Sequence, residues 1–161
     1  MDRAFPEPVE RVASLLRVGA VDATVEELSG GARTAAEAAQ AVGCKLDQIV
    51  KTLVFVCDGA YVLALVPGDR RADERRIAAE LGAREVRVAR ADEVVAATGF
   101  EPGAVAPFPR RGVVGVLMER TLLQHGRVWI GAGSPTHLAA LAPSDLQQLA
   151  GARTADLVAR S

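Results

Sequence analysis

The chain has 161 residues, half of them hydrophobic, which is enough to bury one substantial core, and we expect a single domain over residues 1–161. Acidic and basic residues nearly cancel to a net charge of −1, which excludes a protein that coats long stretches of nucleic acid through charge alone. Aromatic residues make up only 4%, too few for the stacking platforms of a general single-strand binder.

Helices and strands are predicted to alternate along the first part of the chain. Apolar residues at helical spacing over 9–16 indicate a helix that Gly19 closes in a left-handed conformation. Residues 22–27 alternate weakly and are a candidate short strand. Thr34 and the glutamate three positions later have the spacing of a capping box, which predicts a helix with a small-residue face that ends before Gly43.

The clearest local prediction is a β-hairpin. Two apolar runs, 49–57 and 60–66, flank an Asp-Gly pair at 58–59 that supplies the positive φ angles of a tight turn. Lys51 is the only charge in the first run, where an unpaired ammonium would cost about 2–4 kcal/mol. It therefore requires an anionic partner, such as a bound phosphate, or an opening through which its stem reaches water.

The second half of the chain continues with short elements and one long loop. In chain order we first expect a helix around Ile77 that ends at Gly82, a strand at 86–88 and a helix capped by Asp92 that stops at Gly99. Strands are then expected at 113–118, 128–132 and about 138–141. The last helix is expected to begin with a capping box at 144–147 and to end at Gly151. Residues 131–135 are expected to form a glycine turn. The aperiodic, apolar segment 99–109 is typical of a functional loop. Together these elements predict a mixed α/β domain on an irregular, partly antiparallel sheet.

Cysteine and histidine usage predicts no metal site. Cys44 and Cys57 lie far apart in the sequence, and only His125 and His137 could join them around a metal. Both thiols are expected to be reduced and apolar, as in a cytoplasmic protein. No run approaches the ~20 apolar residues of a membrane span, and residues 1–6 lack the apolar region of a secretion signal, so we expect no membrane partner.

Several enzyme classes lack their motifs in this sequence. Ser134 is not flanked by the glycines of a serine-hydrolase elbow, and no dinucleotide or P-loop glycine motif occurs, so no cofactor is predicted. His137 could act as a base, although a single strand histidine is more often packed. What remains is Lys51, its neighbour Thr52 and two glycine-containing loops. This inventory suits hydrolysis of an activated ester, in which one fixed oxyanion donor contributes about 3–4 kcal/mol.

A set of segments, taken in order, resembles a known family. These segments are 34–39 with Gly43, 48–55, 66–69, 98–107 and 131–133. Together they resemble the YbaK/ProX family of aminoacyl-tRNA deacylases, which are relatives of the editing domain inserted in bacterial prolyl-tRNA synthetases. The likeness covers about residues 20–150. It implies a domain of the α+β class in which helices surround a mixed, mostly antiparallel sheet or barrel, with a pocket where the ester of a mischarged aminoacyl-tRNA is hydrolysed.

The resemblance also implies roles for individual residues. The family's lysine corresponds to Lys51, with Thr52 beside it, and is expected to contact the terminal adenosine and phosphates. The family's Gly-x-x-x-Pro loop matches Gly103 to Pro107, where backbone amides would orient the carbonyl and a water. Lys51, Gly103 and Pro107 are therefore the candidate catalytic residues. The candidate substrate-binding residues are Thr52, Gly68, Asp69, Gly131, Gly133 and His137.

The expected partner is the acceptor 3′ end of an aminoacyl-tRNA, and Cys- or Ala-type errors on tRNA(Pro) are the leading substrates. Prolyl-tRNA synthetase is a further candidate partner, and the oligomeric state stays open. Residues 134–137 depart from the pattern of cysteine-specific relatives, so the edited amino acid stays open as well. The arginines at 70–76 could bind phosphates or could form a solvated charged face. The alternatives are an acceptor-end or nucleotide-binding module without turnover, and hydrolysis of a small aminoacyl compound or thioester.

Overall fold

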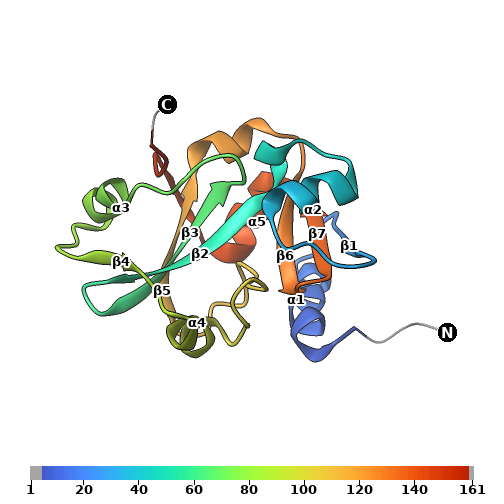
Figure 1. The fold of residues 1–161 in the computed structure, drawn as a ribbon, viewed down its shortest axis with the longest axis horizontal. Helices are drawn as coiled ribbons and strands as arrows, with labels where there is room; N and C mark the ends of the chain where they lie inside the picture. Colours follow the sequence, from blue (N-terminus) through green and yellow to red (C-terminus); the bar gives the residue numbers. More distant parts are fainter. Residues whose placement is uncertain (1–4, 160–161) are drawn as a thin grey trace.

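The structure is a computed structural model that describes residues 5–159, which form five α-helices, two 3₁₀ helices and eight strands (Figure 1). The helices are α1 (Glu7–Val18), α2 (Ala35–Val42), α3 (Glu74–Leu81), α4 (Ala91–Thr98) and α5 (Pro143–Ala150), with the 3₁₀ helices η1 (Leu46–Gln48) and η2 (Arg120–Gln124). The strands are β1 (Thr24–Glu27), β2 (Val50–Cys57), β3 (Ala60–Pro67), β4 (Val86–Val88), β5 (Val113–Glu119), β6 (Val128–Ser134), β7 (His137–Leu141) and β8 (Arg153–Ala155).

The strands form two sheets. The larger sheet has the order β4-β2-β3-β5-β8, in which β4, β2 and β3 are antiparallel neighbours, whereas β3–β5 and β5–β8 are parallel pairs. The smaller sheet, β1-β7-β6, is antiparallel. A parallel bridge between Ile49 and Trp129 brings β6 beside the start of β2. The predicted mixed α/β domain with mostly antiparallel pairing is confirmed, and Figure 1 shows α3 and β4 at one end and the smaller sheet with α1 and α2 at the other.

The β2–β3 hairpin forms where the sequence predicts it. Asp58 and Gly59 have φ angles of 49° and 84°, so both adopt the left-handed conformation of a two-residue turn. The carboxylate of Asp58 accepts hydrogen bonds from the backbone N–H groups of Arg84 and Glu85, and these bonds hold the pKa of that carboxyl below its usual value. The turn is therefore tied to the chain that enters β4.

Strand β2 separates two apolar clusters. Val54 packs into the larger cluster, on the side of the 99–109 loop, and Phe55 packs into the other cluster, on the side of α3. Because side chains alternate across a strand, Thr52 lies on the face of Val54 and Lys51 lies on the face of Phe55. Residues 54–57 of this strand are buried on both of its faces, whereas Lys51 and Thr52 are partly exposed.

The first helix ends differently from the prediction. Gly19 has a φ of −73°, and Ala20, not Gly19, takes the positive φ of 53°. A Cβ at Gly19 would lie 2.9 Å from Cδ2 of Leu149. This glycine therefore lies close to the side chain of Leu149 in α5, and it does not form the left-handed turn.

Two predicted helix starts are also wrong. Helix α4 begins at Ala91, so Asp92 lies within its first turn, and the side chain of Glu93 accepts the N–H of Arg90 at 2.9 Å. Helix α5 begins at Pro143 without a side-chain cap, one residue before the predicted capping box. A proline suits the first helical position because its nitrogen has no hydrogen to leave unpaired.

The predicted glycine turn at 131–135 is mostly strand. Strand β6 continues to Ser134, with an irregular register between Gly131 and Ser134, and the turn falls at Pro135 and Thr136. The α2 cap is confirmed in part, since Thr34 Oγ1 accepts the Glu37 N–H at 3.1 Å. Among residues 5–159, no helix has the length and apolar composition that crossing a membrane requires.

Replacing Glu93 with Gln should make the free energy of unfolding depend less on pH between about 4.5 and 2. Hydrogen bonds from the Arg87 guanidinium and the Arg90 N–H lower the pKa of Glu93 to about 2 from 4.5. Its contribution is therefore fully present above pH 4.5 and is lost as the pH falls towards 2. We expect the urea-unfolding free energy of the unchanged protein to fall more steeply over this window than that of Glu93→Gln.

The matched control is Glu74→Gln, because Glu74 lies in the first turn of α3 and forms no ion pair within residues 5–159. Its pH profile should follow that of the unchanged protein. Parallel profiles for Glu93→Gln and the unchanged protein would contradict the assignment.

Candidate active site

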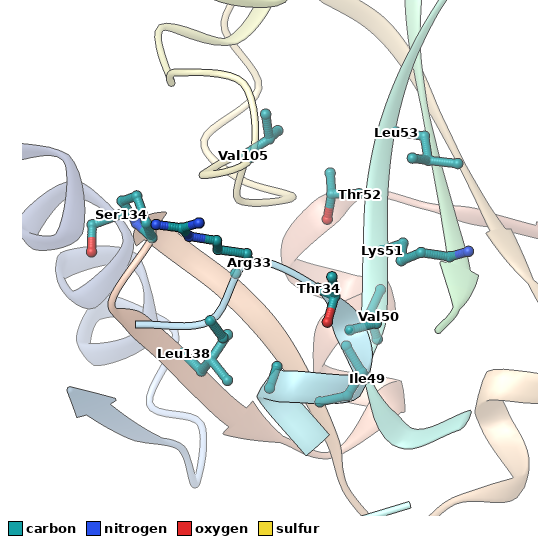
Figure 2. Close-up of a pocket in the computed structure, with 16 residues that line it drawn as sticks. Arg33, Thr34, Ile49, Val50, Lys51, Thr52, Leu53, Val105, Ser134 and Leu138 are labelled. Carbon is teal, nitrogen blue, oxygen red and sulfur yellow. The ribbon is translucent and has the colours of Figure 1, made fainter. Parts of the chain in front are cut away.

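A cavity of about 460 Å³ lies between the two sheets. Figure 2 shows four segments around it: the start of β2, the 103–105 part of the long loop, the β6–β7 hairpin and the start of α2. The lining residues are Ala32, Arg33, Thr34, Ala35, Ala38, Ile49, Val50, Lys51, Thr52, Leu53, Gly103, Val105, Gly131, Ser134, Pro135 and Leu138. The fold thus brings together the sequence-predicted residues Lys51, Thr52, Gly103 and Gly131.

Thr52 presents a polar group on the cavity side of β2. Its side chain faces Val105 across the cavity (Figure 2). Its Oγ1 is buried and has no hydrogen-bond partner among residues 5–159. A buried hydroxyl left without a partner costs about 1–3 kcal/mol, so this group is available to a ligand or a water.

Lys51 contributes to the cavity wall, but its ammonium points away from the cavity (Figure 2). Nζ donates a hydrogen bond to the backbone carbonyl of Arg70 at 2.5 Å. Burial lowers the pKa of the Lys51 ammonium, Asp69 opposes that shift, and Arg71 adds to it. Of the two expectations for this amine, an anionic partner or an opening to water, the structure shows no anion within residues 5–159: a backbone carbonyl is the partner, and the side chain is partly exposed.

The 103–105 segment offers backbone donors. Gly103 has a φ of 82°, a conformation that glycine adopts without strain, and it lies exposed at the cavity. The N–H of Ala104 donates to the carbonyl of Glu101 at 3.0 Å, whereas within residues 5–159 the N–H groups of Gly103 and Val105 make no backbone hydrogen bond. Pro107 is buried behind this segment and does not line the cavity.

Gly131 allows β6 to approach the loop closely. A Cβ at this position would lie 2.9 Å from the carbonyl oxygen of Val105. Gly133 has a φ of 101°, and its Cβ would lie 2.7 Å from the carbonyl oxygen of Pro8. Gly131 therefore shapes the cavity wall, whereas Gly133 lies outside the cavity and packs against the start of α1.

His137 is buried at 3% exposure and does not line the cavity. Its Nδ1 lies 2.6 Å from Ser134 Oγ and 3.1 Å from Thr136 Oγ1, and its Nε2 lies 3.6 Å from Glu27 Oε2. The ring therefore fixes the β6–β7 turn, from which Ser134 and Pro135 reach the cavity. In Figure 2 the hydroxyl of Ser134 points away from the cavity.

Gly68 and Asp69 also lie outside the cavity lining. The Gly68 N–H donates to the Ile49 carbonyl at 2.7 Å, and a Cβ at Gly68 would lie 2.7 Å from the carbonyl oxygen of Leu46. This glycine lets η1 pack against the end of β3. Asp69 is exposed and is the acid that acts on Lys51.

Arg33 is a functional candidate that the sequence does not predict. It is exposed, and Figure 2 shows its guanidinium extending across the cavity towards Ser134. Its backbone N–H donates to Glu37 Oε2 at 2.8 Å, which places it directly before the cap of α2. A cation next to the capping residue Thr34 is the sequence signal that could have identified it.

Comparison with known proteins assigns the class. The profile of the aminoacyl-tRNA editing domain matches residues 29–149, a range that contains every lining residue of the cavity, and the chain belongs to this family. A crystal structure described as a candidate trans-editing enzyme for prolyl tRNA synthetase has a TM-score of 0.89 and 35% identity, covering 98% of this chain and 100% of that chain. The crystal structure of hypothetical protein APE2540 has a TM-score of 0.86 and 30% identity, covering 92% and 99%.

Curated relatives include two proline–tRNA ligases of Nitratidesulfovibrio vulgaris. The ligase of strain DP4 is 39% identical over 121 residues, and that of strain Hildenborough is 37% identical over 120 residues. Each match covers 74% of this chain and 21% of the ligase. The chain thus spans about a fifth of the length of these relatives and is homologous to their editing domain.

Replacing Gly131 with Ala should destabilise the protein by about 1–3 kcal/mol, because the added methyl meets the Val105 carbonyl and one of the two segments must move. The matched control is Gly115→Ala in β5, where a Cβ meets nothing within 4 Å. That change should be neutral or stabilising by up to about 1 kcal/mol. Urea unfolding measures both variants, and equal stabilities would contradict the close approach of β6 to the loop.

Proposed function

We propose that this chain is a trans-editing hydrolase that removes a mischarged amino acid from tRNA by hydrolysing the ester at the tRNA 3′ end. Membership of the editing-domain family supports aminoacyl-tRNA as the substrate class. The likeness to the proline–tRNA ligases and to the trans-editing candidate supports Cys- or Ala-tRNA(Pro) as the substrate. The proposal includes the cytoplasm, where tRNA is charged, as the location of the protein. It also includes prolyl-tRNA synthetase as a further partner.

The observation that carries the proposal is the pairing of the Thr52 hydroxyl with the 103–105 segment across one cavity. A substrate ester placed between them meets the free N–H groups of Gly103 and Val105, which can stabilise the oxyanion. The hydroxyl of Thr52 can hold the attacking water or the ribose hydroxyl.

The reaction needs few protein groups, because an aminoacyl ester is already activated. Water attacks the carbonyl carbon, the bond to the ribose oxygen breaks, and the ribose oxygen takes a proton. The products are the free amino acid and the tRNA with its terminal hydroxyl restored. No side chain is assigned as a general base, and positioning with oxyanion stabilisation supplies the rate enhancement.

The remaining candidate residues are proposed to act around this centre. Lys51 reaches the terminal phosphates only if its amine leaves the Arg70 carbonyl, and in its present position it braces the chain after β3. Pro107 is proposed to fix the loop from behind. The other candidates lie outside the cavity lining, and they are proposed to support the segments that form its walls. These residues are Gly68, Asp69, Gly133 and His137.

The function is tested with the purified chain and a panel of Ala-, Cys- and Pro-tRNA(Pro). We expect catalytic release of amino acid from the alanyl or cysteinyl species, and Lys51→Ala should lose most of this activity. Absence of turnover across the panel would contradict the enzymatic proposal. A tight, salt-dependent tRNA complex without deacylation would instead favour a binding module.

Replacing Thr52 with Val should separate activity from stability. The loss of one hydrogen bond to the reacting groups is expected to lower kcat/KM about tenfold. Because Oγ1 has no partner among residues 5–159, the unfolding free energy should stay constant or rise. Thr24→Val on the exposed strand β1 is the control and should leave activity unchanged. A Thr52→Val protein with full activity would remove this hydroxyl from the mechanism.

A further inference from the structure

The charged residues in the cavity wall are both cations. Within residues 5–159, sixteen residues line the cavity, and the charged ones at neutral pH are Arg33 and Lys51, with no aspartate or glutamate among them. The chain as a whole has a net charge of −1, so this wall differs in sign from the rest of the molecule. A wall of apolar, neutral polar and cationic groups suits a ligand that carries negative charge.

The two cations differ in where their charged groups lie. The Lys51 ammonium is on the face of β2 opposite Thr52 and donates to the Arg70 carbonyl. The Arg33 guanidinium extends towards Ser134, and within residues 5–159 it forms no side-chain hydrogen bond or ion pair. Arg33 is therefore the cation that is available to a ligand in the conformation seen here.

The backbone of Arg33 is held while its guanidinium is free. Its N–H donates to Glu37 Oε2 at 2.8 Å, and the next residue, Thr34, accepts the Glu37 N–H at 3.1 Å. These two bonds fix the point from which the side chain extends, at the start of a helix whose first turn carries partial positive charge. A ligand would therefore order the guanidinium alone and not the segment that bears it.

We propose that Arg33 binds the phosphodiester that precedes the terminal nucleoside of the tRNA acceptor end. This inference rests on the proposed function, which places the ester between Thr52 and the 103–105 segment. The 5′ phosphate of the same nucleoside is the phosphate nearest to that ester, and Arg33 is the cation of the cavity wall whose charged group has no partner within residues 5–159. A guanidinium presents two parallel N–H groups that match two phosphate oxygens, which a single ammonium does not do.

The test measures equilibrium binding to the full chain of two probes that cannot be hydrolysed. The first probe is the trinucleotide CCA with alanine joined to the terminal ribose by a 3′ amide. The second is the matching alanyl amide of adenosine, which has no phosphate. Binding of the first probe is measured over a range of KCl concentrations, so that the slope of log K against log salt reports the number of phosphate contacts.

We expect Arg33→Gln to bind the trinucleotide about tenfold more weakly, as for one lost hydrogen-bonded charged contact. Its salt slope should be smaller by about 0.7, the value for one phosphate contact on a single strand. The adenosine probe should bind both proteins equally. Arg33→Lys should recover part of the affinity for the trinucleotide. Lys51→Gln should lower this affinity less than Arg33→Gln does, because the Lys51 ammonium is bonded to the Arg70 carbonyl.

The control variant is Arg84→Gln, because Arg84 is exposed beside the Asp58 turn at the opposite end of β2. It should behave as the unchanged protein. Equal affinity and salt slope for Arg33→Gln and the unchanged protein would overturn the inference, and so would failure of the unchanged protein to bind the trinucleotide. A protein that binds the probe as expected but hydrolyses no mischarged tRNA would contradict only the proposed function.

Discussion

The register of β2 is the constraint on which the candidate site depends. Val54 and Phe55 are buried in apolar clusters on opposite faces of the strand, and this fixes the direction of every side chain before them. Thr52 consequently faces the cavity, and the ammonium of Lys51 faces the Arg70 carbonyl. A slip of one residue would exchange these two side chains and would expose one apolar set to water, so the clusters and the site hold each other in place.

The β6–β7 wall of the cavity is held by a polar group that lies outside the cavity lining. His137 is buried and fixes the β6–β7 turn through Ser134, and Gly131 allows the resulting strand to approach Val105. The buried carboxylate of Glu119 accepts the Thr121 N–H at 2.7 Å and the Leu157 N–H at 2.8 Å. Two such bonds satisfy a carboxylate without a cation. In the proposed function the reacting centre consists of backbone N–H groups and one hydroxyl, which suits an activated ester.

The sequence predicts those features that local chemistry determines. The Asp-Gly turn requires positive φ at 58–59, so the hairpin follows from a few residues, and the capping threonine before α2 acts in the same way. Features that depend on contacts between segments far apart in the sequence could not be predicted from local patterns. The direction of Lys51 depends on two clusters built from many segments, and the three-residue strand β8 exists only through its pairing with β5. Arg33 gives a weak signal, because a single exposed cation is common on any surface.

The electrostatics of the cavity reconcile the composition of the chain with the proposed function. A net charge of −1 opposes nucleic acid binding only if the whole molecule acts on the ligand. At physiological salt, charges separated by more than about 8 Å are largely screened, so a short single-stranded end responds to the cations nearest to it. The cations in the cavity wall are Lys51 and Arg33, and the first is occupied by a carbonyl in this structure. An acceptor end needs only a few phosphate contacts, so in the proposed function one guanidinium, carried by a backbone that is held at the start of α2, has a large share in placing the ester.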